Sequence, residues 1–142
     1  MSGWLLDVNV LLGCAWEAHA DHSALLNWLL RASDWATSPI TELGFIRVSM
    51  TSAYRATFDD ARKSLESLRA LEGHRFIVDD VDASALSDVS SYKDTTDAHL
   101  IALAKRHGLM LATLDATLIS RSWAAGVAEN PLFQPPSVIT TA

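Results

Sequence analysis

The chain has 142 residues, 49% of them hydrophobic, and a formal net charge of −6 at pH 7. This length fits one domain, residues 1–142, with a core large enough to need no crosslinks. The acidic balance excludes a protein covered in basic surface, but a cluster of catalytic acids in a nucleic-acid enzyme would give the same charge. The single cysteine, Cys14, excludes an internal disulfide framework and fits a reducing compartment.

The beginning of the sequence has none of the features of an export signal. It carries no basic cluster, and Asp7 interrupts the apolar run over residues 4–15. No window approaches the roughly 20 uncharged apolar residues of a membrane span. We therefore expect a cytoplasmic protein with no membrane partner.

Hydrophobic runs and capping residues predict alternating strands and helices through the first half of the chain. In chain order they are a strand over residues 4–8, helices over 9–16 and 23–31, a strand over 35–37 and a helix over 38–50. The last helix begins at Ser38 and Pro39, because serine caps a helix N-terminus and proline fits its first position. Glu42 is therefore expected near the start of this helix.

The second half of the chain continues the alternation. In chain order it holds a helix from residue 58 to a stop at Gly73, a strand over 75–78, a short helix over 82–89, a helix over 97–107, a strand over 109–113, a helical turn over 116–120 and a short strand near Val127. Residues 109–114 are mainly apolar rather than alternating, as expected for a strand covered on both faces. Strands that alternate with helices predict an α/β sandwich around a mostly parallel sheet.

Four acidic residues lie at the boundaries between these elements. Asp7 and Asp115 follow the ends of two apolar strands. Glu42 and Asp97 lie near the starts of two helices. In a parallel α/β sheet, strand ends and the starts of the following helices share one edge, where ligand sites form. We expect the four carboxylates to converge there, although each one alone also fits an ordinary turn or helix-start role.

Carboxylates brought this close together repel one another, and some would take up protons at neutral pH. A divalent cation removes the repulsion, and an all-oxygen ligand set favours Mg²⁺ or Mn²⁺ over zinc. Such an ion binds phosphate oxygens and activates water, so phosphodiester hydrolysis is the expected reaction class. Asn9, two residues after Asp7, and Thr113, two before Asp115, are predicted to support the site.

The sequence around these acids resembles the PIN-domain family, and within it the toxin ribonucleases of bacterial toxin–antitoxin pairs (VapC type). The matching segments are residues 6–11 (LDVNVL), 41–47 (TELGFIR), 96–104 (TDAHLIALA) and 111–115 (LATLD). Their order and spacing match throughout, so the resemblance covers nearly the whole chain. The four segments together are specific, whereas an isolated Asp-x-Asn would be weak evidence.

The resemblance implies a single PIN domain, an α/β/α sandwich with a short, mostly parallel sheet. The residues that it assigns to metal binding and catalysis are Asp7, Glu42, Asp97 and Asp115, with Asn9 and Thr113 beside them. It implies RNA cleavage that depends on Mg²⁺ or Mn²⁺. It also implies a homodimer, and a cognate antitoxin that wraps the toxin and blocks the site.

Two other functions stay open. An α/β phosphatase or phosphotransferase would use Asp7 as a nucleophile. Such enzymes often pair two aspartates two residues apart, whereas here the second position is Asn9 and no suitable downstream lysine is evident. A catalytically inactive binding module is the other alternative, although every acid of the quartet is present.

Some neighbouring residues receive structural interpretations. Asp94 is predicted to cap the helix that carries Asp97 rather than to bind metal. His99 lies two residues past Asp97, about 200° round the helix, and should face away from it. Trp28 and Trp35 fit either the core or an apolar groove for a helix of the antitoxin.

Overall fold

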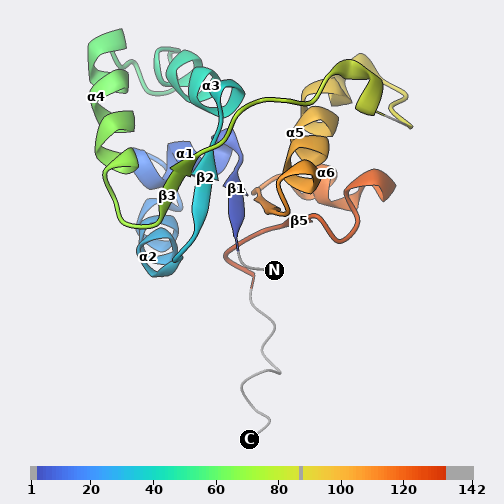
Figure 1. The fold of residues 1–142 in the computed structure, drawn as a ribbon. Coiled ribbons are helices and arrows are strands. Elements are labelled where there is room, and N and C mark those ends of the chain that lie inside the picture. Colours follow the sequence, from blue (N-terminus) through green and yellow to red (C-terminus); the bar gives the residue numbers. More distant parts are fainter. Residues whose placement is uncertain (1–2, 87, 134–142) are drawn as a thin grey trace, which may run out of the picture.

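The computed structural model describes residues 3–86 and 88–133, in which strands and helices alternate (Figure 1). In chain order the elements are β1 (Trp4–Leu6), α1 (Val8–Ala15), α2 (His22–Arg31), β2 (Trp35–Thr37), α3 (Pro39–Ser49), α4 (Phe58–Arg69), β3 (His74–Phe76), η1 (Ala83–Ala85), η2 (Tyr92–Asp94), α5 (Thr95–Arg106), β4 (Met110–Ala112), α6 (Ala116–Ser120), η3 (Ser122–Ala124) and β5 (Ala128–Glu129). The η elements are short 3₁₀ turns. Within the described residues, no helix is both long and apolar enough to cross a membrane.

The described strands form one sheet in the order β3-β2-β1-β4-β5, and every neighbouring pair is parallel. The chain builds outward from β1 to β3 and then returns to add β4 on the other side of β1. The strand order therefore reverses between β1 and β4, which is where open α/β sheets form ligand sites. The predicted α/β class is confirmed, and the described sheet is parallel throughout rather than mostly parallel.

Helices cover both faces of the sheet, with α1 to α4 on one side and α5 and α6 on the other (Figure 1). Successive strand residues point to opposite faces, so Leu6 packs in the core under α1 to α4 and Leu5 in the core under α5. Trp28 and Trp35 both belong to the first core, and Trp35 is fully buried. The structure therefore supports the core interpretation for Trp35, whereas Trp28 belongs to the core and also lines a surface hollow with Trp4 and Leu132.

Gly44 allows α3 to approach α1 closely. A Cβ atom at Gly44 would lie 2.6 Å from Cγ2 of Val8, closer than real Cβ contacts come. Val8 directly follows Asp7, and Gly44 lies two residues after Glu42. The missing side chain thus lets the helix that carries Glu42 pack against the helix that Asp7 begins.

Several predicted boundaries are wrong. The strand predicted over 75–78 is β3, His74–Phe76, because its pairing with β2 runs from Trp35 opposite His74 to Thr37 opposite Phe76. The helix predicted over 82–89 is only the 3₁₀ turn η1, and residue 87 lies outside the described residues. The helix predicted over 97–107 begins two residues earlier, at Thr95.

Candidate active site

Three of the four expected acids meet where the strand order reverses. Asp7 follows β1, Asp115 comes three residues after the end of β4, and Asp97 lies in the first turn of α5. Their proximity is visible in their electrostatics, since the negative charge of Asp115 raises the pKa of Asp7. The charges of Asp7 and Asp115 likewise raise the pKa of Asp97. Because the strands are parallel, these three carboxylates lie near one another at the carboxyl edge of the sheet, as the sequence predicted.

Asp7 is the most buried of these acids, with 8% of its surface exposed. It is the N-cap of α1, and its Oδ1 accepts a hydrogen bond from the backbone N–H of Val8 at 2.8 Å. Its Oδ2 accepts a hydrogen bond from the Thr113 hydroxyl at 2.7 Å. Burial raises the pKa of the Asp7 carboxyl more than these two hydrogen bonds lower it.

Thr113 and Asn9 form the support of Asp7. Thr113 is fully buried, and its hydroxyl accepts from the Asn9 side-chain amide at 3.4 Å and from the Asp115 N–H at 3.1 Å. The Asn9 side-chain oxygen accepts from the Leu114 N–H at 3.2 Å. Asn9 therefore acts on the Asp7 carboxylate through Thr113 rather than by contacting it, and the pair ties the end of β4 to the start of α1.

Asp97 is half-buried, and the pKa of its carboxyl is raised to about 6. Burial is the largest cause, followed by the negative charges of Asp7, Asp115 and Asp94. The positive charge of Arg121 lowers the pKa, but by less. The carboxyl of Asp97 therefore binds a proton more readily than that of an ordinary aspartate, because it is partly buried and lies among other acids.

Asp94 departs from its prediction as a helix cap. It occupies the N-cap position of α5, but its side chain makes no capping hydrogen bond. Instead its Oδ1 accepts from Nη2 of Arg121 at 3.2 Å. Asp94 therefore forms an ion pair with Arg121 in place of a capping hydrogen bond to the backbone of α5. This ion pair places the Arg121 guanidinium beside the aspartate cluster.

Asp115 does have the local role that any N-cap aspartate plays. Its Oδ1 accepts from the backbone N–H groups of Thr117 and Leu118, at 2.9 and 3.1 Å, and so caps α6. The residue is exposed, unlike Asp7. The capping bonds fix the direction of its carboxylate at the mouth of the cluster.

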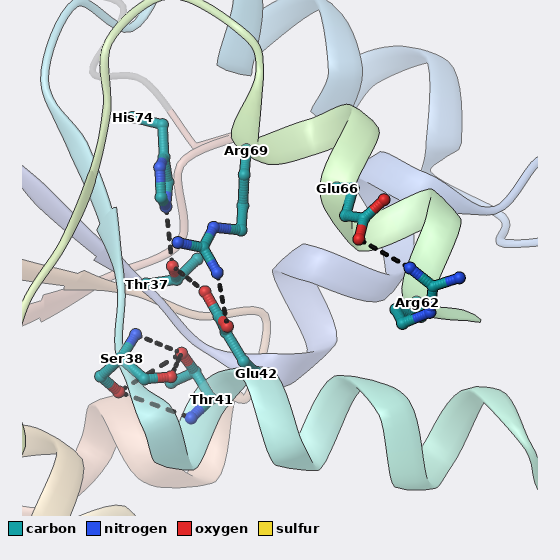
Figure 2. Close-up of polar contacts among 8 residues, drawn as sticks. All are labelled: Thr37, Ser38, Thr41, Glu42, Arg62, Glu66, Arg69 and His74. Atoms are coloured by element: carbon teal, nitrogen blue, oxygen red, sulfur yellow. Dashed lines mark hydrogen bonds and ion pairs between the residues drawn. The ribbon is translucent and has the colours of Figure 1, made fainter. Parts of the chain in front are cut away.

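Glu42 is engaged elsewhere. It lies in the first turn of α3, and its Oε2 accepts from the Thr37 hydroxyl at 2.7 Å (Figure 2). Its Oε1 accepts from Nη1 of Arg69 at 3.2 Å. The charge of Asp115 acts on both Asp7 and Asp97. Glu42 instead contacts a threonine and an arginine.

The donor chemistry of the cluster fits a hard divalent cation. Asp7, Asp97 and Asp115 offer only carboxylate oxygens, which suit Mg²⁺ or Mn²⁺. Their mutual repulsion is what such a cation would relieve. Among residues 3–86 and 88–133, no three histidine, cysteine, aspartate or glutamate side chains are arranged to hold one ion as they stand. The side chains would therefore have to close around an ion.

Sequence reasoning missed the partners of Glu42 and Asp94. Arg69 is 27 residues from Glu42, and Arg121 is 27 residues from Asp94. Neither arginine is part of a recognisable motif. His99 matches its prediction, because its Nε2 pairs with Asp79 at 2.8 Å and not with an acid of the cluster.

Comparison with known proteins agrees with this arrangement. The sequence model of the PIN domain matches residues 4–122. Ribonuclease VapC38 of Mycobacterium tuberculosis (strain ATCC 25618 / H37Rv) is 43% identical over 121 residues, covering 79% of this chain and 84% of that protein. Ribonuclease VapC39 of M. tuberculosis (strain CDC 1551 / Oshkosh) is 41% identical over 135 residues, covering 88% and 96%. Ribonuclease VapC29 of the same strain is 34% identical over 118 residues, covering 80% and 86%.

The fold and the cluster define an α/β protein with an acidic site at the carboxyl edge of a parallel sheet. The matches extend over most of the chain, at identities well above those that chance gives. The chain belongs to the PIN-domain family, in its VapC branch. The resemblance seen in the four sequence segments is confirmed.

Proposed function

We propose that this chain is a metal-dependent endoribonuclease and the toxic component of a type II toxin–antitoxin module. The observation that carries the proposal is the aspartate cluster at the strand-order reversal, where burial and then the negative charges of Asp7, Asp115 and Asp94 raise the pKa of Asp97 to about 6. Relatives named as ribonucleases align with most of the chain, which supports RNA as the substrate. The reaction is hydrolysis of a phosphodiester bond.

We assign the binding of Mg²⁺ or Mn²⁺ to Asp7, Asp97 and Asp115, with Glu42 as a fourth ligand contributed by α3. When bound, a divalent ion supplies Lewis acidity toward phosphate oxygens and water, and positive charge for the developing negative charge. The raised pKa of Asp97 supports this assignment, because a strongly repelling set of carboxylates is suited to a divalent ion.

The remaining residues orient these acids and the substrate. Thr113 holds Oδ2 of Asp7, and Asn9 holds Thr113 in turn. Arg121 lies close enough to Asp97 to lower its pKa. The Arg121 side chain is 41% exposed, and its Nη2 donates to Asp94 at the edge of the cluster. We assign this guanidinium to a phosphate oxygen of the RNA, which matches the geometry of its donors.

We also propose a homodimer and a cognate antitoxin that blocks the site. Both follow from membership of the VapC branch. Light scattering of the purified chain tests the dimer, and a dimer mass is expected. Inhibition of RNA cleavage by a purified candidate antitoxin that binds this chain tests the second proposal, and unchanged cleavage in the bound complex would contradict the assignment.

The phosphatase alternative finds little support. A nucleophilic Asp7 would need an exposed carboxylate oxygen, whereas this side chain is 8% exposed. Both of its oxygens already accept hydrogen bonds, from Val8 and Thr113. A buried carboxylate whose two oxygens each accept a hydrogen bond is better suited to be a fixed metal ligand than a nucleophile.

The decisive experiment treats cellular RNA with the purified chain, free of any antitoxin. Reactions with Mg²⁺, with Mn²⁺ and with chelator are compared with the same reactions of the Asp97→Asn variant. Discrete cuts are expected only with a divalent ion and only from the unsubstituted chain. Absence of cuts from protein shown to be folded and to bind Mn²⁺ would favour the inactive binding module.

A further inference from the structure

Glu42 is held from two sides before any ion is present (Figure 2). Thr37 donates to Oε2 at 2.7 Å, and Arg69 donates to Oε1 at 3.2 Å. Only 14% of the Glu42 side chain is exposed, so these contacts lie in partly desolvated surroundings where hydrogen bonds are strong. The direction of the carboxylate is therefore set by its neighbours.

The hydrogen bonds form a chain with a defined direction. The Thr37 hydroxyl has one hydrogen, and it donates this hydrogen to Glu42. Nε2 of His74 lies 2.7 Å from the same hydroxyl oxygen, so Nε2 must carry the hydrogen of that second bond. The N–H of His74 therefore donates to Thr37, and the hydroxyl of Thr37 donates to Oε2 of Glu42. Hydrogen bonds linked in this way polarise and strengthen one another.

Burial and the positive charge of Arg69 lower the pKa of His74, which keeps this ring neutral at pH 7. A neutral imidazole has one N–H, and the contact with Thr37 fixes it on Nε2. The histidine is therefore an oriented donor and not a second cation beside a site for cations.

The chain of donors rests on the core of the protein. Thr37 is the fully buried last residue of β2, and His74 begins the neighbouring strand β3. The His74 ring packs edge-on against Trp35, with 4.8 Å between ring centroids, and Trp35 is fully buried. Since strands and a buried indole hold both donors, they provide a rigid support for the longer and more flexible glutamate.

Glu42 needs such a support more than Asp7 and Asp115 do. Asp7 and Asp115 are N-caps, and backbone N–H groups of their own helices hold them. Glu42 lies beyond the cap of α3, where Ser38 and Thr41 already satisfy the helix start. Its carboxylate must therefore be oriented by other side chains.

We propose that Thr37 and His74 are positioning residues that orient the Glu42 carboxylate for metal binding. This inference rests on the proposed function, because it takes Glu42 as a ligand of the metal centre. Residues that orient a ligand typically change metal affinity by about 10- to 100-fold when they are lost. The two residues act through Glu42 and do not contact the ion.

The test is a double-mutant cycle read out as Mn²⁺ affinity, measured by calorimetry on the intact chain without RNA. Thr37→Val removes the hydroxyl at nearly constant volume, and Thr37→Ser keeps it. We expect about 10-fold weaker Mn²⁺ binding for Thr37→Val and near-normal binding for Thr37→Ser. In a Glu42→Gln background, Thr37→Val should cause no further loss, because the two changes share one interaction.

His74 provides a second and independent arm, which remains informative if Thr37→Val does not fold. His74→Phe keeps a ring against Trp35 but removes the donor, and His74→Gln restores a donor at a similar position. Weaker Mn²⁺ binding is expected for the phenylalanine variant, with recovery in the glutamine variant. Arg62→Ala is the matched control, because Arg62 forms a neighbouring ion pair with Glu66, at 2.8 Å, outside this chain of contacts (Figure 2).

The outcomes separate this inference from the proposed function. Unchanged Mn²⁺ affinity in folded Thr37→Val and His74→Phe, with loss of affinity in Asp97→Asn, would overturn the positioning role and leave the metal centre intact. An equal loss for Thr37→Val in the presence and absence of Glu42 would also overturn it, because the effect would not pass through Glu42. Unchanged affinity in Asp97→Asn would instead overturn the proposed metal centre.

Discussion

Asp97 and Glu42 occupy comparable places, each in the first turn of a helix that begins at the carboxyl edge of the sheet. Their surroundings are opposite. Asp97 is half-buried and faces the negative charges of Asp7, Asp115 and Asp94, and its burial followed by these charges raises the pKa of its carboxyl to about 6. Glu42 faces the guanidinium of Arg69 and the hydroxyl of Thr37.

The difference shows that one sequence signal, an acid at a helix start, leads to two electrostatic roles. Burial and the neighbouring negative charges disfavour the charged form of the Asp97 carboxyl. Glu42 already has a cation beside it, with Arg69 also lying over the Phe76 ring at 5.1 Å. In the proposed metal site, α5 therefore contributes a carboxyl group among repelling acids, whereas α3 contributes a carboxylate that its neighbours already orient.

The strongest test of this comparison is the loss of activity on the α5 side. Asp97→Asn should reduce the initial rate of RNA cleavage by about 100-fold or more, because a charge in the metal centre is removed while the shape is kept. Circular dichroism should show an unchanged fold. Asp79→Asn is the matched control, because Asp79 pairs with His99 and not with the cluster. A rate within tenfold of the original would contradict the role of Asp97.

Metal binding should be visible as stability. At a Mn²⁺ concentration 100 times the dissociation constant, the unfolding free energy should rise by about 2.7 kcal/mol. The gain should be much smaller in Asp97→Asn at the same concentration. Thermal unfolding with Mn²⁺ and with chelator measures both gains, and equal gains in the two proteins would place the ion elsewhere.

The support of Asp7 should matter less than the acids themselves. Thr113→Val removes the hydroxyl that donates to Oδ2 of Asp7 and accepts from Asn9. Cleavage should slow by about tenfold, as is typical when a residue that orients a metal ligand is lost. Thr113→Ser should restore most of the rate. Equal rates for the valine and serine variants would show that the hydroxyl has no such function.

In the metal-free protein at pH 7, neutralising the two acids should have effects of opposite sign. Asp97→Asn should raise the unfolding free energy because it relieves repulsion, by less than about 1 kcal/mol since the site is half-exposed to solvent. Glu42→Gln should lower it by roughly 0.5 kcal/mol, because it weakens the ion pair with Arg69. Chemical denaturation with chelator measures both, and shifts of the same sign would break the comparison.

The advantage of Asp97→Asn should also depend on pH. The pKa of Asp97 is raised to about 6 in the folded chain from an ordinary value of 3.8, so between these values the folded state binds more protons than the unfolded state. The original protein therefore loses stability relative to the variant as the pH rises from about 4 through 6. The difference should be largest at pH 7 and should vanish near pH 4. A difference independent of pH would contradict the raised pKa.

Local sequence patterns were enough to predict most of the helices and strands and to place the acids near their ends. The apolar runs around Leu5, Ala36 and Leu111 became the three central strands, because each is buried on both faces of the sheet. β3 was displaced by one residue at its start. It is an edge strand with the mixed sequence His-Arg-Phe, so its bounds are set by pairing with β2 rather than by a hydrophobic pattern.

The sequence by itself placed Asp7, Glu42, Asp97 and Asp115 near strand ends or helix starts, and hence predicted that all four would share one edge of a parallel sheet. Three of them, Asp7, Asp97 and Asp115, act on one another through their charges in the structure. Only the tertiary structure decided which charges meet. Arg69 reaches Glu42 across 27 positions, and His74 reaches Thr37 across 37. Periodicity and capping are properties of neighbours along the chain, whereas these contacts depend on strand order and on the packing of helices against each face. For that reason the acids and the supporting pair Asn9 and Thr113 were predictable, whereas the donors and the cation around Glu42 were not.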